Sequence, residues 1–183
     1  MWVVVEWFVI LIAAAVGMAG VLALVAVVAA GASDRVRDGA DSAQSALMAS
    51  GFSAREEHLL ATLASVARAD VGAAAVEIAL APPGWGGDGI VVTGSCIPLQ
   101  RLGARITPGT GTAGHTLATG RTQLAEPRAA VAIPIPGTER LVGVVLAVSP
   151  GGERLFGGAE VRRLETLVDQ TARQLAGPVR RTA

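Results

Sequence analysis

The sequence predicts an α+β domain built on an antiparallel sheet and preceded by a single membrane-spanning helix. Three observations support this prediction. From Trp7 to Ser33 no side chain is charged. Farther along, two pairs of segments rich in β-branched residues are each joined by a glycine-bearing turn, which is typical of hairpins. Amphipathic helical patterns flank these segments, and this order favours helices packed on an antiparallel sheet.

The apolar segment near the N-terminus is long enough to cross a bilayer. From Phe8 to Ala30 a helix rises about 34 Å, against a hydrocarbon core of about 30 Å. A cleaved signal peptide ending near residue 32 is less favoured, because no basic residue precedes the segment and its apolar part exceeds the usual length of about 7 to 15 residues. A buried core helix is weaker still, because such helices rarely stay apolar all round. We expect a transmembrane anchor over residues 1–32, with lipid contacts over residues 7–32.

Basic residues lie on only one side of the predicted span. Arg35 and Arg37 follow the span, and no Arg or Lys precedes it. The positive-inside rule then places the C-terminal domain in the cytoplasm. The expected product is a single-pass protein of the cell membrane.

Charge and cysteine content exclude several classes of function. The formal net charge is zero, so the chain lacks the basic footprint of a nucleic-acid-binding protein. Cys96 is the only cysteine, which excludes an internal disulfide framework and a cysteine-rich zinc site and fits a reducing compartment. Only two histidines are present, so a metal site has no support unless carboxylates supply it. We expect no metal, no cofactor and no nucleic-acid partner.

The first half of the remaining chain predicts two helical segments and a hairpin. Residues 33–52 favour a juxtamembrane helix or a semi-rigid linker, which Gly39 and Gly51 weaken. Ser53 and Glu56 have the spacing of a capping box, and apolar residues at helical spacing follow them, which predicts a helix over residues 54–69. Strands are then expected over residues 74–80, where Glu77 interrupts the apolar pattern, and over residues 89–95.

The second half begins with a loop-rich stretch and ends in a helix. Glycines and prolines interrupt residues 95–124, so only a short helix over residues 112–119 and a short strand over residues 123–125 are expected there. Strands over residues 130–136 and 141–149, joined by a Pro-Gly-Thr turn, form the second hairpin. A terminal amphipathic helix is predicted over residues 159–176, ended by Gly177 and Pro178.

Five motifs in the second half follow one another in a recognisable order. They are Pro108-Gly-Thr-Gly-Thr-Ala-Gly114, Ala118-Thr-Gly-Arg121, Val131-Ala-Ile-Pro-Ile135, Leu141-Val-Gly-Val-Val-Leu-Ala-Val-Ser149, and Phe156 with the terminal helix. This order resembles that of GAF domains, and the similarity covers about residues 52–179. The resemblance implies an antiparallel sheet with helices on its faces and, in many members, a ligand pocket between the sheet and the loop-rich middle. It also implies dimerisation through the first and last helices.

Departures from better-understood GAF domains narrow the expected ligand. Only residues 126–129 separate two of the strands, where ligand-binding members carry a longer lid, so a large tetrapyrrole is disfavoured. The chain has neither Asn nor Lys, so the cyclic-nucleotide signature is absent. One thiol is too few for the catalytic and resolving cysteines of the GAF-like methionine sulfoxide reductases. We therefore expect that the protein is not an enzyme.

Candidate ligand contacts lie in the loop-rich middle: Cys96, Arg105, Thr112, His115 and Thr116. For Cys96 the simpler interpretation is a small buried filler, and for His115 a partly exposed helix residue. The glycine-rich loop over residues 108–114 invites a phosphate-binding interpretation, but it lacks the Lys-Ser/Thr ending of a P-loop, and a structural turn is favoured.

The sequence thus predicts an anchor, a linker over residues 33–52, a GAF-like domain over residues 53–179 and a short tail over residues 180–183. We expect a non-catalytic, membrane-anchored sensory or signalling module that binds a small ligand or a partner protein. It is expected to form a homodimer and to contact a cytoplasmic signalling partner whose identity the sequence does not give. The alternative is a dimerisation scaffold whose pocket small apolar side chains have closed.

Overall fold

The computed structural model describes residues 37–48, 51–82, 87–126, 129–137, 141–152 and 155–176. Among these residues no helix combines the length and the apolar character needed to cross a membrane. The anchor predicted over residues 1–32 and the tail over residues 180–183 lie outside the described residues.

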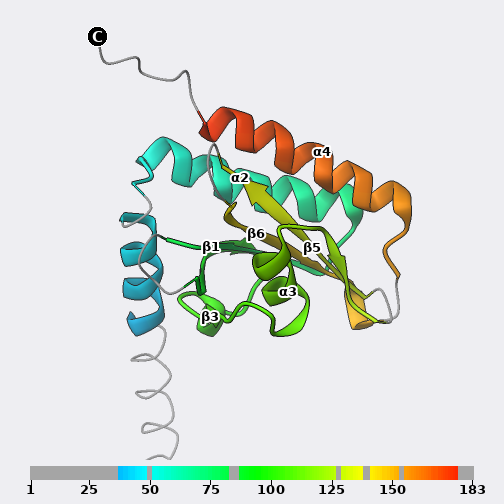
Figure 1. Cartoon of the computed structure of the whole chain (residues 1–183), viewed down its shortest axis with the longest axis horizontal. Coiled ribbons are helices and arrows are strands. Elements are labelled where there is room, and N and C mark those ends of the chain that lie inside the picture. Colours follow the sequence, from blue (N-terminus) through cyan, green and yellow to red (C-terminus); the bar gives the residue numbers. More distant parts are fainter. Residues whose placement is uncertain are drawn as a thin grey trace, which may run out of the picture. The chain divides into compact units, whose positions relative to one another are not determined.

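A six-stranded antiparallel sheet organises the described part of the chain (Figure 1). Its strands are β1 (Ala75–Leu80), β2 (Gly89–Ser95), β3 (Arg105–Ile106), β4 (Gln123–Leu124), β5 (Ala130–Pro136) and β6 (Leu141–Val148). They lie in the order β3-β2-β1-β6-β5-β4. The two predicted hairpins, β1–β2 and β5–β6, are both present, and β1 pairs with β6 to join them.

Helices cover both faces of this sheet. The first face carries α2 (Ala54–Val71) and α4 (Gly158–Leu175), which lie side by side, and α3 (Gly111–Thr119) packs on the opposite face against β5 and β6 (Figure 1). Two 3₁₀ turns, η1 (Leu99–Arg101) and η2 (Pro150–Gly152), also lie among the described residues. Both long helices were predicted to within two residues of their observed ends, whereas η1 and β3 were not predicted.

The start and end of α2 follow from local chemistry. The Glu56 carboxylate accepts hydrogen bonds from the Ser53 backbone amide at 2.6 Å and from the Ser53 hydroxyl at 2.7 Å. The Glu56 amide in turn donates to Ser53 Oγ at 3.4 Å, which completes the predicted capping box. At the other end Gly72 takes a left-handed conformation with φ of 60° and ends the helix at Val71, two residues beyond its predicted end.

The alternation of side chains along the strands builds two apolar clusters. Val131, Ile133 and Ile135 of β5 point toward α2 and α4 and join the larger cluster, in which Leu60, Leu164 and Phe156 are buried. The intervening Ala132 points to the other face. There it belongs to a smaller cluster of buried residues with small or medium side chains: Ala79, Val91, Ile106, Ala113, Ala132 and Val144.

The segment before α2 packs against the sheet domain. Residues 37–48 are helical, and Ala46 and Leu47 are buried in the larger cluster. Gly39 lies against the turn after η1: a Cβ on Gly103 would come within 2.7 Å of the Gly39 Cα. Gly39 therefore allows this helix and the turn after η1 to approach closely. The sequence pattern predicted only that Gly39 weakens the helix.

Candidate functional site

The face of the sheet beneath α3 is filled by side chains. Leu117 of α3 is packed against the smaller cluster and extends to β2, where a Cβ on Gly89 would lie 2.8 Å from Leu117 Cδ1. The same Cβ would lie 3.6 Å from the Cβ atoms of Ala79 and Ile106, so all three of these side chains lie close around Gly89. This is the region where the resemblance implied a ligand pocket, and small aliphatic residues occupy it.

The five predicted ligand contacts lie at different depths around this face. Thr116 is buried, and its hydroxyl donates to the Ala132 carbonyl at 3.3 Å. Thr112 is half-buried on the same helix, and His115 is exposed. Arg105 is exposed on β3, with its guanidinium 3.5 Å from the Asp88 carboxylate.

The exposure of Cys96 differs from what the simpler interpretation of its role predicts. The residue directly follows β2, has a positive φ of 57°, and is exposed. The interpretation of Cys96 as a buried filler is therefore wrong. The structure brings Thr112, His115 and Thr116 onto one short helix, while Cys96 and Arg105 lie on separate segments.

The glycine-rich loop before α3 forms its hydrogen bonds within itself. The Gly109 amide donates to the Gly114 carbonyl at 2.8 Å, and the Thr110 amide donates to the Thr107 carbonyl at 3.1 Å. Gly114 is buried, and a Cβ there would collide with the Thr107 carbonyl oxygen. The Gly109 and Thr110 amides are therefore not free to bind an anion, which favours the structural-turn interpretation for this part of the loop.

A charged pair that sequence reasoning missed lies at the centre of the sheet. Glu77 of β1 is only 8% exposed. Its two carboxylate oxygens accept hydrogen bonds from Arg101 of η1, at 2.8 Å from Nε and 2.7 Å from Nη2. Hydrogen bonding to Glu77 raises the pKa of Arg101, against the opposing effect of partial burial. This bidentate pair fixes η1 to the sheet.

A groove lies along the outer side of the α2–α4 pair. Its volume is about 430 Å³. Its walls are formed by Val66 and Asp70 of α2 together with α4 residues Ala159, Arg162, Arg163, Thr166, Leu167 and Gln170. Val66 is a 45% exposed hydrophobic residue. Arg163 Nε lies 3.5 Å from Asp70 Oδ2, so an ion pair joins the two helices beside this apolar position. We call this surface the α2–α4 groove.

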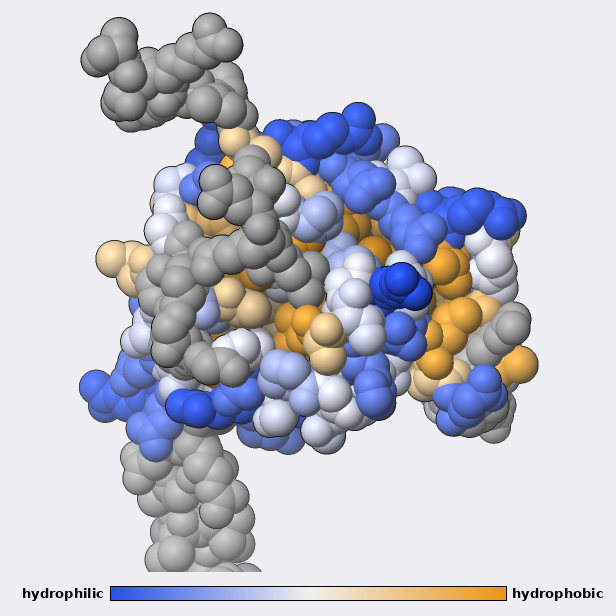
Figure 2. All heavy atoms as spheres, viewed as in Figure 1, coloured by the Kyte–Doolittle hydropathy of each residue, from blue (hydrophilic) through white to orange (hydrophobic). Residues whose placement is uncertain are grey.

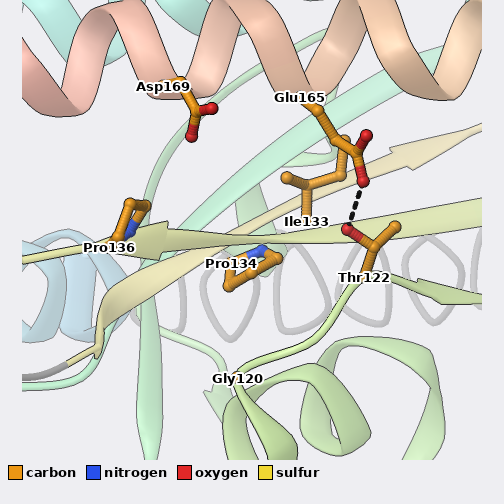
Figure 3. A pocket seen from close by; sticks show the side chains of 7 residues that line it. All are labelled: Gly120, Thr122, Ile133, Pro134, Pro136, Glu165 and Asp169. Atoms are coloured by element: carbon orange, nitrogen blue, oxygen red, sulfur yellow. Dashed lines mark hydrogen bonds between the residues drawn. The ribbon is translucent and has the colours of Figure 1, made fainter.

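A second hollow opens on the opposite flank of α4 (Figure 3). It has a volume of about 400 Å³ and is lined by Gly120, Thr122, Ile133, Pro134, Pro136, Glu165 and Asp169. Figure 2 shows this side of the molecule: hydrophilic residues lie along α4, and hydrophobic residues are visible below it. Within the described residues, no three His, Cys, Asp or Glu side chains gather as a metal site would require.

Solved structures provide the comparison for this fold. The GAF-B domain of DevS from Mycobacterium smegmatis has a TM-score of 0.58 at 22% identity, with 70% of this chain and 99% of that chain covered. The GAF domain of the Acinetobacter phosphoenolpyruvate-protein phosphotransferase has a TM-score of 0.57 at 12% identity, covering 74% of this chain and 91% of that chain. fRMsr of Staphylococcus aureus, solved in complex with substrate, has a TM-score of 0.53 at 20% identity, covering 64% of this chain and 82% of that chain.

These likenesses define the class of fold. Neither a protein-family profile nor a curated protein sequence matches the chain. At these low identities the structural likeness shows the fold alone. The described domain has a GAF-like α+β fold, as the order of its sequence motifs predicted.

Proposed function

We propose that this chain is a non-catalytic signalling module of GAF-like fold that acts through protein contacts, with self-association through α2 and α4. The observation that carries the proposal is the filled face beneath α3. Val91, Ala132 and Val144 are at most 1% exposed there, and Leu117 closes over them. Ligand sites are usually hollows of about 300 to 1,000 Å³. The hollows of that size described above lie on the two flanks of α4. At the face beneath α3, where the resemblance implied a ligand pocket, we favour contact with a protein over binding of a small ligand.

The α2–α4 groove supports self-association. Its exposed Val66 and half-buried Leu167 form an apolar centre. Asp70, Arg162 and Arg163 place side chains of both signs of charge at the rim. A two-fold axis brings the same patch of two copies together, so a patch that carries both signs of charge is self-complementary. Two copies of the chain can therefore form a homodimer through this one surface.

The test is the mass of the full chain in detergent, measured by light scattering after gel filtration, for wild type and Val66→Glu. We expect a dimer for wild type and at least about a tenfold weaker association for the variant, because it places a carboxylate at the apolar centre. Ser65→Glu is the matched control: Ser65 is the exposed neighbour on α2 and does not line the groove. A monomeric wild type, or a Val66→Glu variant that still dimerises, contradicts the proposal.

We also propose that residues 7–32 tether the module to the cell membrane with the domain in the cytoplasm. The uncharged segment and the two arginines that follow it support this orientation. A reporter that is active only in the cytoplasm, fused after Ala183, is expected to be active. An inactive cytoplasmic reporter together with an active extracytoplasmic reporter at the same position reverses the orientation.

A further inference from the structure

Three hollows on the β5 side of α4 join into one trough. The hollow in Figure 3 shares Pro136 and Asp169 with the next one. The second hollow shares Pro136, Gly137, Ala172 and Ala176 with a third. Along α4 the trough runs from Glu165 to Ala176, a rise of about 16 Å. That length matches about five residues of an extended chain. We call this surface the β5–α4 trough.

One wall of the trough is a strand edge that offers acceptors without donors. The Ala125 amide donates to the Ala130 carbonyl, and the Ser149 amide donates to the Ala129 carbonyl. The backbone groups of residues 130, 132 and 134 therefore point away from β6, toward β4. Pro134 stands at the last of these positions and has no N–H. Pro136, which follows an irregularity in the pairing with β6, has no N–H either. Beyond Ala132, where the pairing with β4 ends, this edge cannot take up another strand as a regular ladder.

The opposite wall adds negative charge at one end of the trough. Figure 3 shows the carboxylates of Glu165 and Asp169 directed from α4 toward β5 and the segment after α3. Thr122 lies next to Glu165, and its hydroxyl already donates to Glu165 Oε1 at 2.7 Å (Figure 3). The groups lining this end are therefore mainly acceptors, and they favour a cation with several N–H donors.

The other end of the trough is apolar. Its hollow, of about 220 Å³, is lined by Phe52, Ile135, Pro136, Gly137, Val142, Ala172, Leu175 and Ala176. Arg173 stands on the wall between the two ends, and its Nε donates to the Asp169 carbonyl at 3.2 Å. The acidic end and the apolar end are separated by about seven residues of α4, which is about 10 Å or three residues of extended chain.

We propose that the β5–α4 trough binds an extended segment of a partner protein that carries an arginine and, three positions away, a large apolar side chain. The guanidinium lies between Glu165 and Asp169, where its planar donors match two carboxylates better than the compact ammonium of lysine does. The apolar side chain occupies the hollow beside Phe52 and Leu175. This surface lies on the opposite flank of α4 from the α2–α4 groove, so the inference goes beyond the self-association proposed above.

The probe is a fluorescein-labelled peptide, Leu-Ala-Ala-Arg-Ala-Ala-Leu, in which a leucine stands three positions from the arginine in either direction. Its binding to the full chain is followed by fluorescence anisotropy. We expect saturable binding, weakened at least about tenfold by Asp169→Asn and by replacing the peptide arginine with glutamine. Replacing both leucines with serine weakens binding as well, through the apolar end.

Asp41→Asn is the matched control, because Asp41 is an exposed carboxylate on the helix over residues 37–48. It is expected to leave peptide binding unchanged. The proposal is overturned if wild type shows no saturable binding, if Asp41→Asn weakens binding as much as Asp169→Asn, or if the glutamine peptide binds equally well. If Asp169→Asn abolishes self-association and Val66→Glu does not, the occupant is a second copy of this chain and the partner segment is ruled out. We expect Val66→Glu to lose dimerisation and still bind the peptide. This result would show that the two surfaces act independently, so the peptide test can fail without affecting the proposal for the α2–α4 groove.

Discussion

The buried carboxylate of Glu77 is stable only because Arg101 meets both of its oxygens. We expect Arg101→Leu to lower the free energy of unfolding by about 2 to 3 kcal/mol, since it leaves a charge unpaired within the sheet. A fully buried pair would lose more, but the Arg101 side chain is 41% exposed, and water takes up part of the loss. Urea unfolding followed by far-ultraviolet circular dichroism measures the change.

The matched control for this pair is Arg105→Leu, which removes an exposed arginine at 3.5 Å from Asp88. It is expected to cost less than about 1 kcal/mol. The double variant Glu77→Leu with Arg101→Leu removes both charges and should recover most of the lost stability. An Arg101→Leu variant as stable as wild type would mean that water reaches Glu77 freely.

Leu117 determines whether the face beneath α3 is closed. Leu117→Ala removes the side chain that contacts Gly89 and packs against the cluster that contains Ala79 and Ile106. We expect a loss of about 2 kcal/mol in unfolding free energy, at the low end for a leucine because the residue is half-buried. The space it leaves is apolar, so saturating benzene should restore part of the melting temperature in the variant and have little effect on wild type.

The control is Leu124→Ala on β4, where the side chain is 38% exposed. This change is expected to cost under about 1 kcal/mol and to give no benzene effect. If benzene stabilises wild type as strongly as Leu117→Ala, the face already contains an open cavity, and the case for a protein-contact module loses its main support.

At the scale of single elements, α2 depends on its capping box. Ser53→Ala removes the hydroxyl that accepts from the Glu56 amide, and we expect a cost of about 1 kcal/mol. The same substitution at Ser65, exposed in the middle of α2, should be neutral or slightly stabilising because alanine is the better helix former. Thermal unfolding of the two variants side by side measures the difference. Equal melting temperatures would show that the start of α2 is held by packing and not by its cap.

Elements were predictable where a long periodic pattern fixes them. The apolar repeat of α4 and the β-branched residues of β5 and β6 extend over many positions, so their types and, to within one residue, their boundaries follow from sequence. β3 has two residues and η1 has three, too few for any period to show. Their positions depend on tertiary contacts: Arg101 reaches Glu77, which is 24 residues earlier in the chain.

At the scale of the whole molecule, the candidate sites are made from segments that sequence reasoning treats separately. The β5–α4 trough joins Thr122, Pro134 and Asp169, which no local motif links. The α2–α4 groove joins helices from opposite ends of the domain. Sequence patterns do show which residues face the core. They do not show how the outer flanks of packed helices meet, since that depends on the angle at which the helices cross.

The extent of the folded unit is also a property of the whole molecule. The compact unit begins at Asp38 and so includes residues 38–48 of the segment that the sequence pattern placed in a linker over residues 33–52. Ala46 is 0% and Leu47 is 4% exposed in the larger cluster, and the Phe52 amide donates to the Leu47 carbonyl at 3.3 Å. A fragment that begins at residue 51 should therefore be less stable than one that begins at residue 37.

We expect the difference in unfolding free energy between these two fragments to be about 3 kcal/mol, because burial of a leucine contributes about 2 kcal/mol and burial of an alanine about 1 kcal/mol. Urea unfolding of both fragments under the same conditions measures it. Leu47→Ala in the longer fragment should reproduce more than half of the loss, whereas Ser45→Ala, at an exposed position on the same helix, should have little effect. If the two fragments are equally stable, residues 37–48 do not contribute to the core, and the domain begins at its first capping box, as the sequence pattern predicted.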